Sequence, residues 1–240
     1  MKCEPELPED DDTAGVRLAK RVAALGGWSR RDAELLIDNG TVRVDGTVAV
    51  LPQMRVRPEQ RVEIEKNARP LPVPPVTLLL HKPAGVELDP AAPLAGAQRS
   101  AADRSGLRPL PRHLVDQRCV APLGARDSGL VVFTQVHGVE RKLVEDAALL
   151  EHELQVEVAG EATPEALQAM RPARVSIGSQ REGRTVLRFA IKGPQPGQVS
   201  NLCARAGLQV LGVRRLRLGR VALAGLAPGE WRYLRGDEKF

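Results

Sequence analysis

The chain has 240 residues, of which 42% are hydrophobic, and a net charge of +5. This length suffices for one large core or two modest ones, and we predict two domains. No apolar stretch approaches the roughly 18 residues that cross a bilayer, and the acidic N-terminus lacks an apolar segment, so we expect neither a membrane anchor nor a signal peptide.

The cysteines and the charges restrict the class of protein further. Cys3, Cys119 and Cys203 lack CxxC spacing, so we expect no disulfide framework, no metal and no cofactor, and a cytoplasmic location. Residues 1–12 carry a local charge of −5, which leaves +10 for the remainder. Of the 35 cations 28 are arginine, whose planar fork matches phosphate oxygens. This excess favours a nucleic-acid partner, although a GC-rich genome would also raise the arginine content.

Residues 1–15 are predicted to form an acidic disordered tail. Residues 16–66 predict two helices and a hairpin. Apolar residues from Val16 to Leu25 recur at helical spacing, and Gly26-Gly27 ends the first helix. Ser29 is the predicted N-cap of the second helix, with Asp32 at the capping-box position. The hairpin is predicted by valines that alternate around a tight-turn dipeptide: Val42, Val44, Asp45-Gly46, Val48 and Val50.

Two arginines occupy an unfavourable place in this segment. Arg30 and Arg31 fall in the first turn of the second helix, where the helix dipole disfavours each exposed positive charge by about 0.3 to 1 kcal/mol. Free N–H groups and guanidiniums at a helix start form a phosphate site. A solvated charged face is the alternative interpretation. The candidate RNA contacts of this segment are Arg17, Lys20, Arg21, Ser29, Arg30 and Arg31.

The order of these residues closely resembles the S4 RNA-binding domain. The S4 pattern is Arg-Leu-x-Lys, then Gly-x-x-Ser-Arg-Arg-x-Ala-Glu-x-Leu-Ile, then Gly-x-Val-x-Val-x-Gly. This chain supplies Arg17-Leu18-Ala19-Lys20, Gly26, Ser29 to Glu34, Leu36-Ile37, Gly40, Val42, Val44 and Gly46. The resemblance implies that the two helices bind structured RNA through its backbone, with the paired arginines in the contact.

Four prolines in residues 67–76 predict an extended linker, so we place the domain boundary there. The second domain, residues 77–240, mixes strands and helices, which argues for an α+β fold. Its predicted strands are Val76 to Leu80, Leu130 to Phe133, Leu154 to Val158, Val186 to Ile191 and Leu208 to Val213. Its predicted helices are Val139 to Leu149, Pro164 to Met170 and Gln198 to Ala206, and residues 88–109 are predicted to form a long loop.

This second domain resembles the catalytic domain of the RsuA/RluB/RluF type of rRNA pseudouridine synthases, a family that also begins with an S4 domain. The family's Asn-Lys-Pro-x-Gly-Val appears as His81 to Val86. Its closing segment appears as Val213 to Gly219 and as Leu226 followed by Gly229 to Leu234. The resemblance implies an S4 module tethered to a mixed-sheet pseudouridine synthase domain.

The positions that the family uses for catalysis are replaced. Its aspartate, in Gly-Arg-Leu-Asp-x-x-(Thr/Ser)-x-Gly-Leu, corresponds to Gly124 within residues 121–130. Its base-stacking tyrosine corresponds to Leu154, and the arginine that pairs with the aspartate corresponds to Gly197. An unpaired, partly buried arginine would cost several kcal/mol, so joint loss of the pair is physically coherent. The resemblance therefore implies a member without the nucleophile or base that the isomerisation requires.

One residue, Asp127, is a candidate for a relocated carboxylate, and it is a weak one. It lies three residues beyond the expected position, and we expect it to miss the reacting atom by several ångströms, where about 1 Å can cost a hundredfold in rate. The alternative interpretation of residues 126–129 is a polar turn that precedes a strand.

A second group of RNA-contact candidates lies in this domain. Residues 205–220 hold five arginines and no acid, which predicts a positive surface along a strand. A strand edge protected by charge is the alternative. The candidates are Lys82, Arg126, Arg214, Arg215 and Arg217.

Together these patterns predict a monomeric, cytoplasmic RNA-binding protein, directed at rRNA or a ribosomal precursor, that is catalytically impaired or inactive. The competing hypothesis is an active 23S or 16S rRNA pseudouridine synthase with a relocated carboxylate. A third hypothesis is that the basic surface binds an acidic protein.

Overall fold

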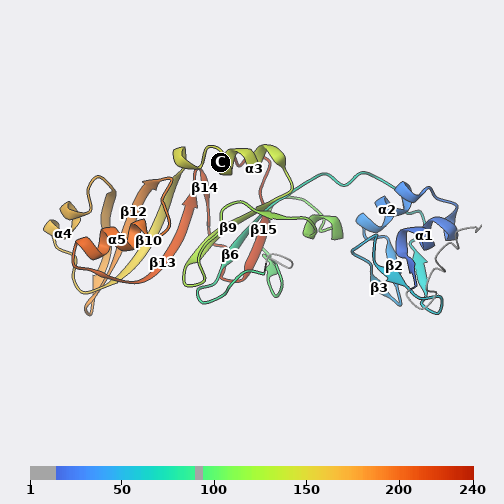
Figure 1. Cartoon of the computed structure of the whole chain (residues 1–240), viewed down its shortest axis with the longest axis horizontal. Helices are drawn as coiled ribbons and strands as arrows, with labels where there is room; N and C mark the ends of the chain where they lie inside the picture. The colour runs from blue at the N-terminus through green and yellow to red at the C-terminus, as the bar shows by residue number, and fades with distance from the viewer. Residues whose placement is uncertain (1–14, 90–93) are drawn as a thin grey trace, which may run out of the picture. The chain divides into compact units, whose positions relative to one another are not determined.

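The computed structural model describes residues 15–89 and 94–240 (Figure 1). The chain divides into two compact units, which we describe separately. Unit 1 comprises the residues up to 74 together with 108–116, and unit 2 comprises residues 75–107 and 117–240. Apart from Gly15, the predicted acidic tail lies outside the described residues. Within the described ranges, no helix combines the length and apolar character that crossing a bilayer requires.

In its described residues, unit 1 consists of two helices, a three-stranded sheet of order β3-β2-β5 and a two-stranded sheet, β1-β4. All pairings in both sheets are antiparallel. The elements are β1 (Val16–Arg17), α1 (Leu18–Gly26), α2 (Arg30–Asp38), β2 (Val42–Val44), β3 (Thr47–Val48), β4 (Arg55–Val56), β5 (Val62–Ile64) and the 3-10 turn η2 (Pro111–Leu114).

The helix and turn signals in unit 1 are confirmed, with two corrections. Gly27 ends α1 at a φ of 67°, and Ser29 caps α2. The predicted start of the first helix was wrong, because Val16 pairs with Val56 in a strand. Leu25 was assigned to the apolar face, yet it is 54% exposed, because α1 buries only Leu18, Ala19 and Val22.

Ser29→Ala is expected to destabilise unit 1 by about 1 kcal/mol. The Ser29 hydroxyl accepts a hydrogen bond from the backbone N–H of Asp32 at 3.1 Å, which satisfies one of the unpaired N–H groups at the start of α2. The urea midpoint, read from Trp28 fluorescence in a Trp231→Phe background, measures the loss. Ser29→Thr keeps a hydroxyl and is the control, so an equal loss in both variants would contradict the capping role.

The predicted hairpin is confirmed in position and turn type. Asp45 and Gly46 have φ values of 50° and 80°, the left-handed pair that a two-residue hairpin turn requires. Arg43 pairs with Val48 across the turn. One face of this hairpin and the two helices bury a common core, which includes Leu18, Val22, Ala33, Leu36, Ile37, Val42, Val44 and Val56.

Unit 2 is built on one ten-stranded sheet of order β11-β12-β10-β13-β9-β6-β15-β7, with β14 beside β13 and β8 beside β9. The pairs β13-β9 and β15-β7 are parallel, and the other pairs are antiparallel. The elements before residue 150 are β6 (Thr77–Lys82), β7 (Gln98–Arg99), β8 (Arg118–Cys119), β9 (Ser128–Thr134), α3 (His137–Val144) and η3 (Ala147–Leu149). Those after it are β10 (Glu151–Ala159), α4 (Pro164–Ala169), β11 (Arg174–Arg181), β12 (Arg184–Lys192), α5 (Gln198–Arg205), β13 (Gln209–Leu218), β14 (Val221–Ala222) and β15 (Glu230–Tyr233).

The continuous apolar run 130–133 is explained by burial on both faces of the sheet. Leu130 and Val132 of β9 pack in one core with Leu143 of α3. Val131 and Phe133, whose side chains point to the opposite face, pack in another core with residues of β6 and β15. A strand covered on both sides needs no polar alternation.

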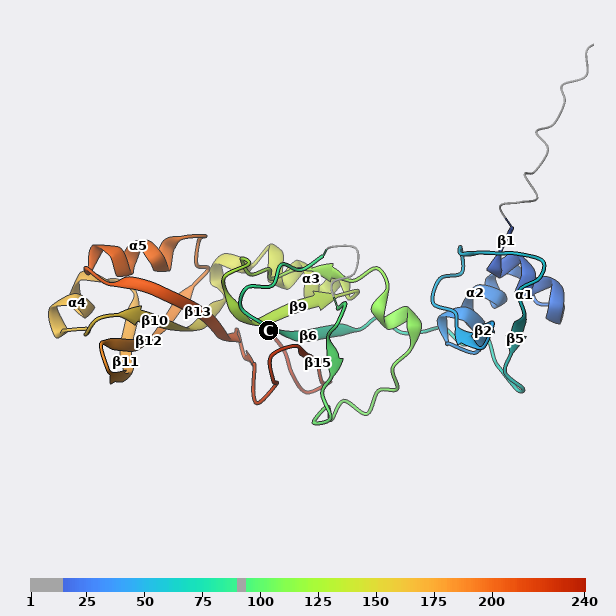
Figure 2. The same cartoon turned by 90° about the horizontal axis from the view of Figure 1, so that it is seen from below.

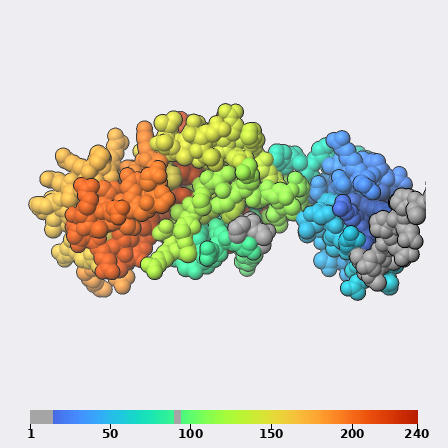
Figure 3. All heavy atoms as spheres, in the orientation of Figure 1, coloured from blue at the N-terminus to red at the C-terminus, as the bar shows by residue number. Residues whose placement is uncertain are grey.

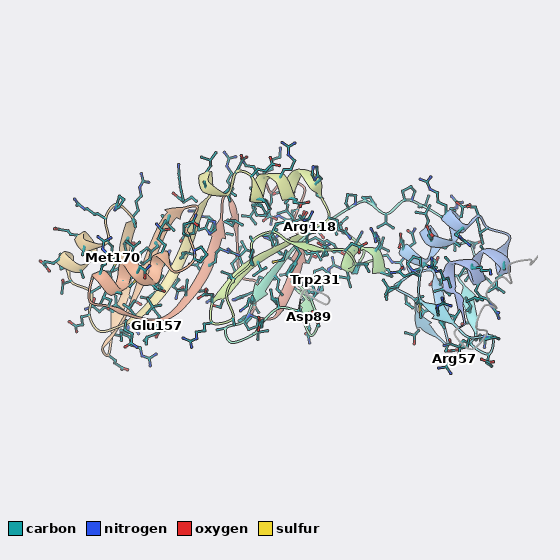
Figure 4. All side chains as sticks on the ribbon, viewed as in Figure 1. Arg57, Asp89, Arg118, Glu157, Met170 and Trp231 are labelled. Atoms are coloured by element: carbon teal, nitrogen blue, oxygen red, sulfur yellow. The ribbon has the colours of Figure 1, made fainter. Side chains whose placement is uncertain are left out.

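A further core lies at the β10–β12 end of the sheet. Figure 2 shows α5 along one face of β10 and β13, and α4 beside it. Met170, which follows α4, is fully buried in this core, whereas Trp231 of β15 belongs to the core around Phe133 (Figure 4). The two ends of the sheet therefore have separate hydrophobic cores.

The predicted α+β class is confirmed, and the predicted strands and helices lie where unit 2 forms them, with differences at their ends. The helix predicted for 139–149 is shorter, because α3 ends at Val144 and a separate 3-10 turn follows. Strand β11 was not predicted. Its side chains are exposed at all but one position, so it lacks the apolar alternation that identifies a strand.

Candidate functional site

A cavity of about 440 Å³ opens on unit 2 beside β13. Four stretches of chain line it: the loop 120–127, the segment from Leu143 to Leu154, the loop 193–200 at the start of α5, and β13. Figure 3 shows the yellow-green segment after α3 bordering the orange α5 segment on the face in view. Residues that are far apart in the sequence therefore meet at one concave site.

The three positions at which catalytic groups were expected all line this cavity: Gly124, Leu154 and Gly197. Leu154 is buried, at 5% exposure, and offers an aliphatic wall. Gly197 adopts a φ of 75° at the N-cap of α5. A Cβ added at Gly124 would meet a single heavy atom within 4 Å, Oδ2 of Asp127, at 3.3 Å. The site therefore has room at residue 124 but no side chain there.

Asp127 lies closer to this position than we predicted. Its backbone N–H donates to the carbonyl of Gly124 at 3.1 Å, which closes a turn and folds the carboxylate back beside residue 124. The side chain is half-buried and lines the cavity. The distance argument against a relocated carboxylate is therefore weaker than the sequence alone indicated.

The structure explains why glycine is needed at position 129, which the motif retains. It adopts a φ of 106° and pairs with Arg215 where β9 and β13 run parallel. A Cβ at this position would meet the backbone of Arg215, so only glycine allows the two strands to approach.

Lys82 and Arg215, both predicted as RNA contacts, are buried. Lys82 is fully buried, and its Nζ donates to the carbonyls of Pro83, Ala125 and Asp127 at 3.1, 3.0 and 2.8 Å. Arg215 is 4% exposed, and its guanidinium donates to the carbonyls of Leu130 and Ala121. Both cations hold the loop 121–128 in place. Lys82 therefore presents no charge at the surface, and Arg215 only borders the cavity.

Burial sets the protonation states around the cavity. It lowers the pKa of His152 to about 4, with a further contribution from Arg215, so this imidazole is neutral at pH 7. It also lowers the pKa of Arg215 to about 10, which leaves the guanidinium charged at pH 7. Burial lowers the pKa of Lys82, and the charge of Asp127 opposes that shift. The wall of the cavity thus combines one carboxylate, Asp127, with the buried cation Arg215 and a neutral imidazole, while Lys82 lies behind the loop 121–128.

The arginines of β13 do not form the continuous positive surface that we predicted. Arg217 donates to Glu151 at 2.8 Å and to Glu153 at 3.1 Å, and the bond to Glu151 is the main reason that its pKa is raised. Arg214 is half-buried. Arg126, by contrast, is exposed on the turn beside Asp127. Acids on the neighbouring β10 neutralise Arg217, which residues 205–220 alone could not indicate.

In unit 1 the structure brings together three of the predicted RNA contacts. Arg17, Lys20 and Arg30 line one hollow of about 440 Å³, and Arg31 is exposed beside it in sequence on the first turn of α2. The other two are engaged within the unit. Arg21 donates to the carbonyl of Pro58 at 3.4 Å, and the Ser29 hydroxyl donates to Asp32 at 2.7 Å.

Sequence reasoning missed Arg112, which lines the same hollow. It belongs to η2, in the segment 108–116 that groups with unit 1 although we assigned all of 77–240 to the second domain. Pro111 of this turn packs so closely to Gly40 that a Cβ on Gly40 would lie 2.9 Å from it. No local pattern near residue 112 indicates this contact, because it joins segments about 70 positions apart.

Comparisons with known proteins agree with both units. The family model described as "S4 domain" matches residues 16–62. The "Putative ribosomal large subunit pseudouridine synthase SVR1, chloroplastic" of Arabidopsis thaliana is 30% identical over 85% of this chain, which spans 54% of that relative's length. The "Dual-specificity RNA pseudouridine synthase RluF" of Escherichia coli (strain K12) is 25% identical over 94% of this chain and 77% of its own.

Among solved structures, one described as "Crystal structure of pseudouridylate synthase" superposes with a TM-score of 0.50 at 19% identity, covering 92% of this chain and 96% of that one. The fold and the site therefore define an S4-domain protein built on the pseudouridine synthase scaffold. The chain is thus similar to RNA pseudouridine synthases in sequence over most of its length, and in fold to one of them.

Proposed function

We propose that this protein binds rRNA or a ribosomal precursor through its S4 domain and its cavity, and that it does not isomerise uridine. The observation that carries the proposal is the meeting of Gly124, Leu154 and Gly197 at one cavity. These are the positions expected for a nucleophile, a stacking ring and the cation paired with the nucleophile. Because they line one site, their replacement removes a whole catalytic arrangement rather than one scattered residue.

The binding part of the proposal rests on unit 1. Arg17, Lys20 and Arg30 are exposed around one hollow, and Arg31 adds a fourth exposed cation at the start of α2. Cations at such a helix start match phosphate groups, which are the dominant source of affinity for RNA. Similarity to a relative that is named a putative ribosomal large subunit pseudouridine synthase supports an rRNA partner for this chain.

Purified protein is expected to release no tritium above background from rRNA labelled with 5-³H-uridine, because glycine at position 124 cannot attack or deprotonate anything. RluF of Escherichia coli, assayed on the same RNA, is the positive control. A filter-binding measurement on the same sample must show that the RNA is bound. A lack of turnover then cannot result from a lack of binding. Turnover comparable to the control would contradict the proposal.

A second candidate function is supported by the place of Asp127. Its carboxylate oxygen lies 3.3 Å from where a Cβ of residue 124 would be, on the wall of the cavity. Under this alternative the protein is an active synthase, and any tritium release disappears in Asp127→Asn, which keeps the size of the side chain. Release that persists in Asp127→Asn would exclude Asp127 as the catalytic residue.

A further inference from the structure

A second cavity, of about 580 Å³, lies on unit 2 next to the first one along β13. Leu218 at the end of β13 lines the first cavity, and Arg220, two residues later, lines the second. The Cα atoms of residues two positions apart in the chain lie at most about 7 Å from each other. The remaining walls come from residues 100–104, from the turn 222–226 and from the segment 232–239.

The lining of this second cavity is strongly basic. It holds five cations against Asp237 and Glu238, a net charge of +3. Both acids are engaged within the wall, since Glu238 pairs with Arg232 at 2.7 Å and Asp237 pairs with Arg235 at 3.2 Å. The unneutralised charge therefore belongs to the other three cations: Arg104, Arg220 and Lys239.

These three side chains are free to meet a ligand. Each residue is exposed, and none forms an ion pair with another residue in the described part of the chain. They come from three separate segments, namely the loop after β7, the turn between β13 and β14, and the residues after β15. Cations held on three sides of one hollow keep their mutual repulsion unless an anion binds between them.

Two residues that line the second cavity, Arg232 and Glu238, hold the segment after β15 in place. The Arg232 side chain is 10% exposed and forms a two-point contact with Glu238, at 2.7 and 2.8 Å. Glu238 also accepts from the backbone N–H of Arg235 at 3.0 Å. This buried pair holds residues 235–239 against the sheet, so that Lys239 is carried by an anchored segment.

We propose that this second cavity binds backbone phosphates of the RNA strand that flanks the nucleotide in the first cavity. The inference rests on the proposed RNA-binding function and assigns a further contact to it. Two of the three unpaired cations are arginines, whose forked donors fit phosphate oxygens in two-point contacts. RNA presents a phosphate at every nucleotide, so a strand that enters the first cavity also supplies phosphates within the short span to Arg220.

The test is the triple variant Arg104→Ala/Arg220→Ala/Lys239→Ala, titrated with a fluorescein-labelled RNA stem-loop from about 50 to 300 mM KCl. Each lost phosphate contact lowers the slope of log K against log salt by about 0.7 to 0.9, so the triple variant is expected to lose about 2 units of slope. A control triple, Arg171→Ala/Arg181→Ala/Lys192→Ala, removes the same charge from exposed positions near the β11 edge, outside this cavity, and is expected to lose less than about one unit.

Each outcome has a defined meaning. If the wild-type protein and the control triple bind RNA and the cavity triple keeps the salt slope of the wild type, this inference is overturned. The proposed function then still stands. Equal losses in both triples also overturn it, because they show a diffuse charge effect. If the cavity triple keeps its RNA affinity and loses affinity for polyglutamate, the occupant is an acidic protein segment and the inference fails. Wild-type protein that binds no RNA overturns the proposed function itself.

Discussion

Lys82→Met is expected to lower the free energy of unfolding of unit 2 by about 2 to 3 kcal/mol. The Lys82 Nζ donates to the carbonyls of Pro83, Ala125 and Asp127, and the carbonyl of Ala125 also accepts from the backbone N–H of Gly85 at 2.9 Å. Methionine fills a similar volume without a donor, so all three carbonyls lose the hydrogen bond from Lys82. Relief of the buried charge offsets part of this loss.

Trp231 makes the measurement specific to unit 2. It is 6% exposed in the core of that unit, and Trp28→Phe removes the other tryptophan of the chain. Urea unfolding followed by Trp231 fluorescence therefore reports the stability of unit 2. The matched control is Lys142→Met, whose Nζ pairs with Asp146 at 2.9 Å on the surface and contributes less than about 0.5 kcal/mol. A loss no larger than that of the control would show that Lys82 does not hold the loop 121–128.

Arg30→Ala/Arg31→Ala is expected to weaken RNA binding by about 10- to 100-fold, which corresponds to about 1.4 to 2.8 kcal/mol for the loss of two exposed phosphate contacts. The salt slope should fall by about 1.5 to 2 units. The stability of unit 1 should move the opposite way, because alanine relieves two positive charges at the start of α2 of an unfavourable interaction with the helix dipole.

Opposite changes in RNA affinity and in the stability of unit 1 distinguish a binding role of these arginines from a structural role. Arginines that support the fold would lower stability when replaced, whereas arginines kept for a ligand lower only affinity. The control is Arg57→Ala/Lys66→Ala, which removes the same charge from exposed positions on the loop after β4 and after β5. Equal loss of affinity in both variants would show that the first turn of α2 is not a specific contact.

The predictions for Lys82 and for Arg30 and Arg31 concern two different roles of basic residues in this chain: one supports the fold and the other binds RNA. The arginine excess suggested a positive surface in both halves of the chain. In unit 2 much of that charge is internal or neutralised, because Lys82 and Arg215 fasten backbone carbonyls and Arg217 pairs with Glu151 and Glu153. The exposed, unpaired cations of unit 2 lie elsewhere, and Arg104, Arg220 and Lys239 gather at one cavity.

The sequence by itself determined what depends on near neighbours along the chain. The cap at Ser29, the end of α1 at Gly27 and the hairpin turn at Asp45-Gly46 follow from backbone preferences of a few adjacent residues, and all three are present. The spacing from Leu123 to Leu130 also identified Gly124 as the position to examine, because motif spacing is a local property. The α+β class followed from the order of such segments.

Only the tertiary structure decided which residues meet. The sheet places β13 between β10 and β9, so that Glu151 and Glu153 neutralise Arg217 and two backbone carbonyls bind Arg215. The turn that brings Asp127 beside Gly124, and the addition of η2 to unit 1, likewise depend on contacts that no local pattern encodes. Local backbone preferences determine the helices, strands and turns. Burial and pairing between distant segments determine whether an arginine lies at the surface, where it can contact a ligand, or lies in the core, where it binds backbone carbonyls.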